Sequence, residues 1–156
     1  MRQIKLHNSS ESITVDDEDF DRLSVFKWYL KPTGRSVFRA TSRALGTINI
    51  SIGNEIMHTR HVVYDHIDRD CFNNQKSNLR VCSDSQNMAN RGKFKNCTSK
   101  YKGVSWHKRD RIWSSMIMIN RKPIYIGSFK SEIEAARAYD KKAFELFKEF
   151  ACLNNV

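Results

Sequence analysis

The sequence has no apolar run of about 18 residues, the length that a membrane-spanning helix requires. It opens with Met1-Arg2-Gln3 and shows no apolar signal-peptide region behind them. No C-x-x-C pair occurs among the four cysteines, which are Cys71, Cys82, Cys97 and Cys152. A zinc site is therefore not expected, and the cysteines are interpreted as buried or idle thiols of a reducing compartment. These absences predict a soluble, cytoplasmic protein that is not secreted.

The sequence carries an excess of positive charge. The 156 residues carry a formal net charge of +10, which favours a polyanionic partner, either nucleic acid or an anionic membrane. The excess is uneven, because residues 11–21 are acidic and the chain from Arg91 onward is rich in lysine and arginine. The C-terminal half is therefore the predicted polyanion-binding half. The length allows one domain or two small ones.

The first 56 residues carry β patterns. Alternation of apolar and polar residues predicts strands around Ile4–Leu6 and Ile13–Val15, and residues 25–30, 36–41 and 47–52 are also β-prone. Residues 16–23 favour a short acidic helical turn, and residues 32–35 a reverse turn. We expect a small β-rich subdomain that packs against the segment that follows. Its arginines Arg35, Arg39 and Arg43 either contact phosphates or lie on solvated strand faces.

Residues 63–90 read as strand, polar loop, strand and helix. The first strand ends at Asp65-His66, residues 79–82 alternate as a second strand, and Ser83 or Asp84 can cap a helix that carries Asn87. This order could bring Asp65 and His66 to Asn87. Carboxylate and amide oxygens suit Mg²⁺, and histidine is a natural base near neutral pH. Taken singly, each of these residues is better explained by structure, with Asp65 and the asparagines as turn residues and His66 as a strand-end histidine.

The pattern D-H-I-D…N-N…S-N-L-R-V…S-Q-N resembles the HNH nuclease motif of the ββα-metal class, in the version of phage and intron homing endonucleases that ends in Asn. The resemblance implies that Asp65 and Asn87 hold Mg²⁺ (or Mn²⁺) and that His66 is the general base. It also implies that Asn78 braces the loop and helps to orient that base. If the chain is phage-encoded, it would act in the host cytoplasm.

Two further histidines precede this motif. His58 and His61 could hold a metal, but segments of this kind are helical in the family, which favours a structural or phosphate-contacting role for His58 and Arg60. Metal binding by either histidine is the less favoured alternative.

The chain beyond residue 100 predicts a three-stranded antiparallel sheet and a helix. Strands are expected over 101–107, 111–120 and 123–129, joined by short turns. Ser131 and Glu134 match a capping box, and Ile133, Ala136, Tyr139, Ala143 and Phe147 recur at helical spacing. The helix would cover one face of the sheet and leave the other face free. In the second strand Met116 and Met118 point to one side, and Trp113 and Ile117 to the other.

The pattern Y-K-G-V-S-W…G-S-F-x-S-E-x-E-A-A-R-A-Y-D, within residues 99–154, resembles the Apetala2-type DNA-binding domain of plant ethylene-response factors and its nuclease relatives. The resemblance implies a DNA face made of Lys102, Ser105, His107, Met116, Met118 and Tyr125. Phosphate contacts are expected from the basic residues around it, Lys100, Lys108, Arg109, Arg111, Arg121 and Lys122, and from the linker residues Arg91, Lys93 and Lys95.

Together these patterns predict an α+β protein: a β-rich N-terminal part with a ββα-metal HNH motif, then a three-stranded antiparallel sheet packed on one helix. The expected domains are a nuclease domain over 1–91 with its motif at 57–90, a basic linker over 92–99, and an Apetala2-type domain over 100–156. The predicted function is a metal-dependent endonuclease or nickase of homing type that acts on double-stranded DNA as a monomer or homodimer. The alternatives are a DNA-binding regulator with an inactive nuclease motif and, on charge and aromatic residues alone, an RNA-binding protein.

Overall fold

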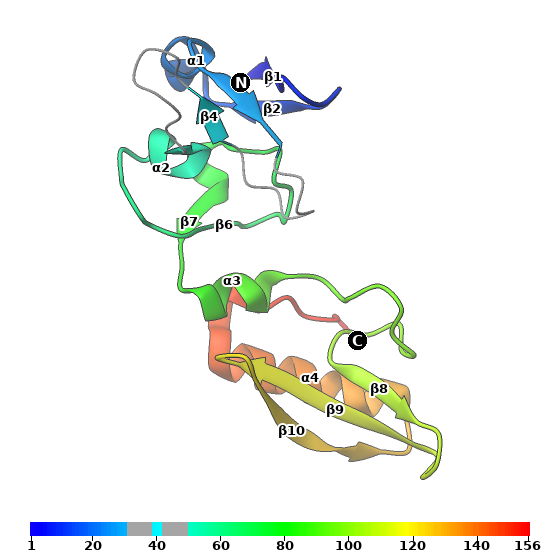
Figure 1. Ribbon diagram of the computed structural model, residues 1–156. Helices are drawn as coiled ribbons and strands as arrows, with labels where there is room; N and C mark the ends of the chain where they lie inside the picture. Colours follow the sequence, from blue (N-terminus) through cyan, green and yellow to red (C-terminus); the bar gives the residue numbers. More distant parts are fainter. Residues whose placement is uncertain (31–38, 42–49) are drawn as a thin grey trace. The chain divides into compact units, whose positions relative to one another are not determined.

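A computed structural model of the chain describes residues 1–30, 39–41 and 50–156. The chain forms two compact units, Met1–Cys82 and Ser83–Val156 (Figure 1). Among the described residues, no helix is both long enough and apolar enough to cross a membrane. The predicted turn at 32–35 and the side chains of Arg35, Arg39 and Arg43 lie outside the described residues.

The first unit opens with an antiparallel hairpin of β1 (Arg2–Lys5) and β2 (Ser12–Val15), followed by α1 (Asp17–Ser24). A second sheet has the order β3 (Lys27–Tyr29), β4 (Arg39–Thr41) and β5 (Ile50–Ser51). The expected strand over 47–52 ends early, because Ile52 begins the short helix α2 (Ile52–Ile56). The strands predicted from alternation are confirmed, since Ile13 and Val15 are fully buried while their neighbours face outward.

One hydrophobic core joins these elements to the segment with the HNH-like pattern. It contains buried side chains from β1 and the residue after it, and from β2, α1, β3, α2 and β7 (Leu79–Val81). These are Ile4, Leu6, Ile13, Val15, Leu23, Trp28, Ile52, Ile56 and Leu79. Tyr64, Cys71 and Phe72 pack against it. The expected packing of a β-rich subdomain against the following segment is therefore confirmed.

The strands of that segment are β6 (Tyr64–His66) and β7, which pair antiparallel, with the 3-10 turn η1 (Lys76–Asn78) between them. The helix α3 (Asp84–Asn90) follows β7 in sequence but belongs to the second unit. It is tied there by the Cys152 N–H, which donates to the Ala89 carbonyl. The predicted nuclease domain over 1–91 thus includes residues of both units, and the ββα-metal arrangement stays a prediction.

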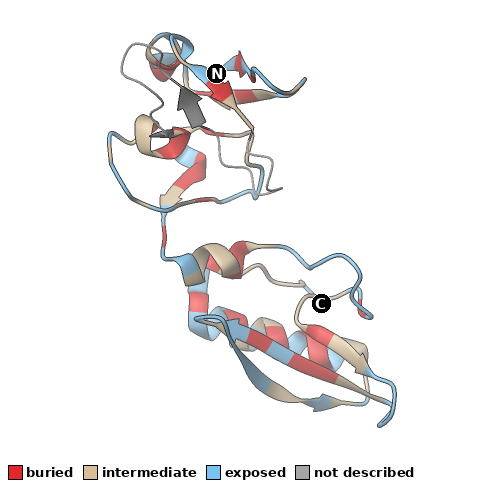
Figure 2. Ribbon diagram, in the orientation of Figure 1, coloured by how far each residue is buried: buried red, intermediate tan, exposed pale blue. Residues whose placement is uncertain are grey.

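The second unit contains the predicted three-stranded sheet, in the order β10 (Lys122–Phe129), β9 (Ile112–Ile119) and β8 (Val104–His107). Along β9, Ile117 is buried while Met116 and Met118 are exposed, so the alternation predicted for these three residues is confirmed. Figure 2 shows buried and exposed stretches along the strands of this sheet. Asn120 and Arg121 form the β9–β10 turn, and both have positive φ. Positive φ at two central residues is the signature of a type I′ hairpin turn, whose twist matches that of the strands.

The helix α4 (Glu132–Phe147) covers the sheet with Ala135, Ala136, Tyr139, Ala143 and Phe147, and η2 (Lys148–Phe150) follows it. Two helix expectations were wrong. The Ser131 hydroxyl accepts from the Ile133 N–H, one residue before Glu134, so this end carries a simple N-cap in place of a capping box. Ile133 itself is exposed, so it is not part of the buried face of the helix.

Gly103 lies where β8 begins and has a φ of 75°. A Cβ there would lie 2.0 Å from the Cδ2 atom of Tyr139. Only glycine therefore allows the Tyr139 ring of α4 to lie against this turn. Between α3 and β8 the chain is irregular, and its end is anchored by Ser99, whose hydroxyl donates to Glu132.

Candidate functional site

The loop between β6 and β7 is organised around Asp68. One carboxylate oxygen accepts from the Asp70 N–H at 2.7 Å and from the Asn78 amide at 2.9 Å, and the other accepts from the Asn73 amide at 2.8 Å. Asn78 is buried, and its side chain also bonds the Asp68 N–H and the Asn73 carbonyl. Asn78 therefore cross-links both ends of the loop.

The same contacts determine the charge state of Asp68. Desolvation by burial raises the pKa of the Asp68 carboxyl, but the hydrogen bonds from Asp70, Asn78 and Asn73 and the nearby His66 ring together lower it below its usual value. The loop is thus built on an ionised carboxylate.

Asp65 is buried at the centre of β6, directly opposite Arg80 of β7. The Arg80 guanidinium donates two hydrogen bonds to one carboxylate oxygen of Asp65, at 2.9 and 2.7 Å. This charge-assisted pair compensates the cost of burying the carboxylate.

His66 ends β6 and is half-buried. Its Nε2 atom lies 3.0 Å from the Oδ1 atom of Asn74, which is almost completely buried. The Asn74 amide nitrogen donates to the Cys71 carbonyl at 3.0 Å. His66 is therefore attached to the loop through Asn74.

Asn87 lies on α3 in the second unit and is half-buried. The helix begins at Ser83, whose side chain and that of Gln86 form a reciprocal capping box. Of the two caps considered from the sequence, Ser83 is the one used. The structure thus brings Asp65, His66 and Asn78 together in the first unit, and it places Asn87 in the other.

The two other histidines lie in a turn. His58 and His61 are exposed and have φ values of 51° and 60°, so the expected helical segment is not formed there. Helix α2 ends before them, at Ile56. Over the ranges that the structure describes, no three His, Cys, Asp or Glu side chains form a group that could hold a metal ion.

The predicted DNA face corresponds to the sheet face opposite α4. Tyr125 pairs with Met116 and Ser105 with Ser114, and His107 lies two residues beyond Ser105. Met116, Met118, Tyr125 and His107 are exposed, and Ser105 is half-buried with its hydroxyl against Ser114. Lys102 differs, because its ammonium donates to the Ala89 carbonyl of α3 and lies near the Tyr139 ring.

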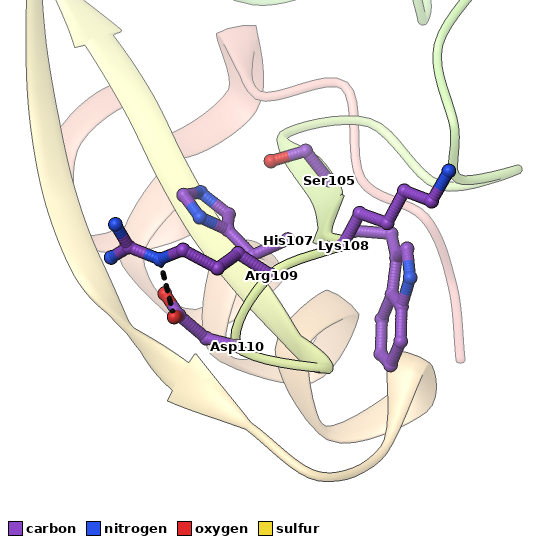
Figure 3. Close-up of a pocket in the computed structure, with 6 residues that line it drawn as sticks. Ser105, His107, Lys108, Arg109 and Asp110 are labelled. Carbon is purple, nitrogen blue, oxygen red and sulfur yellow. Dashed lines mark hydrogen bonds and ion pairs between the residues drawn. The ribbon is translucent and has the colours of Figure 1, made fainter.

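The basic residues predicted to bind phosphates are mostly exposed. These are Lys93, Lys95, Lys100, Lys108, Arg109, Arg111, Arg121 and Lys122, whereas Arg91 is half-buried. A shallow hollow of about 500 Å³ lies along β8 and the β8–β9 turn, lined by residues 105–110 (Figure 3). Arg109 pairs there with Asp110 at 2.9 Å.

Comparison with known proteins decides the family. The chain is 32% identical over 139 residues to an uncharacterized HNH endonuclease of Acanthamoeba polyphaga mimivirus, covering 86% of this chain and 70% of the relative. The chain belongs to the HNH endonuclease family. No family model and no solved structure matches this HNH protein.

A second similarity concerns part of the HNH chain only. Over 52 residues it is 44% identical to APETALA2-like protein 2 of rice, in both the indica and the japonica subspecies of Oryza sativa. The match covers 32% of the HNH chain and 12% of each rice protein.

Sequence reasoning missed Asn74 and gave Arg80 no role of its own. Arg80 could have been found, since any hairpin that pairs His66 with Leu79 puts it opposite Asp65. Asn74 gave no such signal, because its place depends on a contact with β2, about 60 residues earlier in the chain.

Proposed function

We propose that this HNH protein is a metal-dependent DNA endonuclease or nickase of homing type, which hydrolyses phosphodiester bonds at a preferred site. The observation that carries the proposal is His66, held at the end of β6 by Asn74 and adjacent to the buried Asp65. A histidine with a fixed ring can accept a proton near neutral pH.

The proposed cofactor is Mg²⁺ (or Mn²⁺). The proposed ligands are the Asp65 carboxylate and the Asn87 amide oxygen, both hard oxygen donors. Mg²⁺ commonly keeps several waters and takes one or two protein carboxylates, so a group of three protein ligands is not required. When bound, such an ion would stabilise charge on the phosphate and leaving oxygens. Arg80 holds the Asp65 carboxylate in place for this role.

His66 is proposed to accept a proton from water as the water oxygen bonds to phosphorus. The bond from phosphorus to the 3′-oxygen then breaks, and the 3′-oxygen takes up a proton from solvent water, which leaves a 5′-phosphate and a 3′-hydroxyl. Asn78 supports this step by keeping the loop closed on Asp68.

The C-terminal unit is proposed to hold double-stranded DNA. The exposed side chains of Met116, Met118 and Tyr125 would face bases, with the neighbouring lysines and arginines on phosphates. The local similarity to APETALA2-like protein 2 supports this assignment.

The test is conversion of supercoiled plasmid with Mg²⁺, with an EDTA control. The His66→Ala variant should cut about 10²–10⁴-fold more slowly with unchanged DNA affinity. His61→Asn is a matched control, because His61 is an exposed histidine with a positive φ that asparagine tolerates. It should cut like the wild type.

Full activity of His66→Ala would overturn the assignment, and loss of activity in His61→Asn would move it toward the earlier histidines. No conversion of DNA that the protein binds would favour the DNA-binding regulator. Open-circular product would indicate a nickase, and linear product a double-strand cut.

A further inference from the structure

The side chain of Asn74 has only one orientation that satisfies both of its partners. It is 1% exposed, and its amide nitrogen lies 3.0 Å from the Cys71 carbonyl oxygen. A carbonyl oxygen can only accept, so the NH₂ group must face Cys71. The Asn74 Oδ1 atom is thereby directed to Nε2 of His66, 3.0 Å away.

This orientation decides where the His66 ring carries its hydrogen. An amide oxygen has no hydrogen to donate, so the Nε2 atom must be the donor in this contact. A neutral imidazole carries one N–H, so the lone pair of His66 that can accept a proton then lies on Nδ1.

Asn74 is itself fixed by the first hairpin of the chain. Its N–H donates to the Thr14 carbonyl at 2.8 Å, and the Thr14 N–H donates to the Phe72 carbonyl at 2.7 Å. Thr14 lies between Ile13 and Val15, both fully buried in the core. Asp16 continues this attachment, because its carboxylate accepts from the Lys76 N–H at 2.8 Å and the Gln75 amide at 3.0 Å. The loop thus has a rigid support.

We propose that Asn74 is a positioning residue that holds neutral His66 in the Nε2–H tautomer and so presents Nδ1 to the attacking water. The role of Nδ1 rests on the proposed nuclease function, whereas the tautomer follows from the contacts alone. The family resemblance gives the orienting role to Asn78, but the side chain of Asn78 is bonded to Asp68 and to the backbone of Asn73. Asn78 closes the loop, and Asn74 orients the ring.

The test is ¹H–¹⁵N NMR of the histidine rings in the full chain, at a pH where they are neutral. His66 is assigned from the signals missing in His66→Ala. The wild type should show His66 as the Nε2–H tautomer. Finding the Nδ1–H tautomer would overturn the proposal.

A matched pair of variants tests the role of the side chain. Asn74→Leu keeps a similar size without the acceptor, and should give mixed tautomers with kcat about 10–100-fold lower and unchanged DNA affinity. Asn73→Leu alters the adjacent residue, whose amide bonds Asp68, and should leave the tautomer as in the wild type. Equal tautomer shifts in both variants, or none in a folded Asn74→Leu, would overturn the proposal.

The two readouts separate this inference from the proposed function. If the wild type cuts no DNA but its Nε2–H tautomer is lost only in Asn74→Leu, the orienting contact stands and the nuclease assignment fails. If the wild type cuts and Asn74→Leu cuts equally well with mixed tautomers, the positioning role fails and the nuclease assignment stands.

Discussion

Arg80 lies directly across the β6–β7 pair from Asp65 and donates two hydrogen bonds to one oxygen of its carboxylate. The Asp65 side chain is only 5% exposed, and that of Arg80 16%. A buried carboxylate is costly without a partner, so this ion pair is a condition for Asp65 to occupy its place in the sheet.

Replacing Arg80 should therefore destabilise the first unit. We expect Arg80→Ala to lower the free energy of unfolding by about 3–5 kcal/mol, because it leaves a buried carboxylate without its guanidinium. Urea unfolding of the full chain measures this loss. Arg60→Ala, which removes an exposed arginine of the 57–63 turn, should change stability by less than about 0.5 kcal/mol. Similar losses in the two variants would show that the pair with Asp65 is not the cause.

A second buried carboxylate gives the first unit its expected sensitivity to acid. Asp19 of α1 is 4% exposed and pairs with Arg22 at 2.6 Å and with Lys76 at 3.1 Å. Burial raises the pKa of Asp19, but the hydrogen bonds and charges of Arg22 and Lys76 lower it below its usual value overall. The folded state thus binds fewer protons than the unfolded state as the pH approaches the ordinary aspartate range.

The stability from Asp19 is fully present above the unfolded pKa of about 3.9 and is lost as the pH falls through the lower, folded pKa. Urea midpoints should therefore decrease below about pH 4.5, and Asp19→Asn should flatten this decrease. Part of it should remain, because Asp68 is shifted in the same direction. Asp21→Asn, which alters an exposed carboxylate of the same helix, should retain the wild-type slope. An equal slope in all three proteins would contradict the assignment.

The elements that could be predicted from the sequence are those with local causes. The β8–β9 and β9–β10 hairpins follow from alternation and short turns, and the buried face of α4 follows from small residues at helical spacing. The helical segment that the family resemblance implies around His58 is not formed, because His58 and His61 adopt positive φ, which no apolar periodicity encodes.

What could not be predicted depends on contacts between distant residues. Asn74 is placed by Thr14, and Asp16 reaches η1 about 60 residues later. Lys102 shows the same limit in the second unit, where its N–H donates to Asn154 at 2.7 Å and its ammonium to Ala89. The family pattern assigns Lys102 to the DNA face, but its amine already has partners within the unit. The basic residues of the turns are therefore the better test of DNA binding.

Arg121 is a turn residue whose positive charge can be removed without loss of the hairpin. It has a φ of 65° in the two-residue turn that begins with Asn120, and it is exposed. Asn-Gly is the preferred sequence of a type I′ turn, so Arg121→Gly should keep or improve the hairpin while it removes one positive charge.

If Arg121 contacts a phosphate, Arg121→Gly should weaken binding to all duplex sequences alike and reduce the slope of log K against log salt by about 1. Binding is measured with the full chain in EDTA, so that cleavage does not interfere. Lys141→Ser is the matched control, because it removes the same charge from an exposed position on α4, the helix that covers the other face of the sheet. Its salt slope should equal that of the wild type.

If Lys141→Ser reduces the slope as much as Arg121→Gly, net charge alone attracts the DNA and the sheet face has no special role. If only Arg121→Gly reduces it, the DNA lies at the β9–β10 turn, next to Met118 and Tyr125.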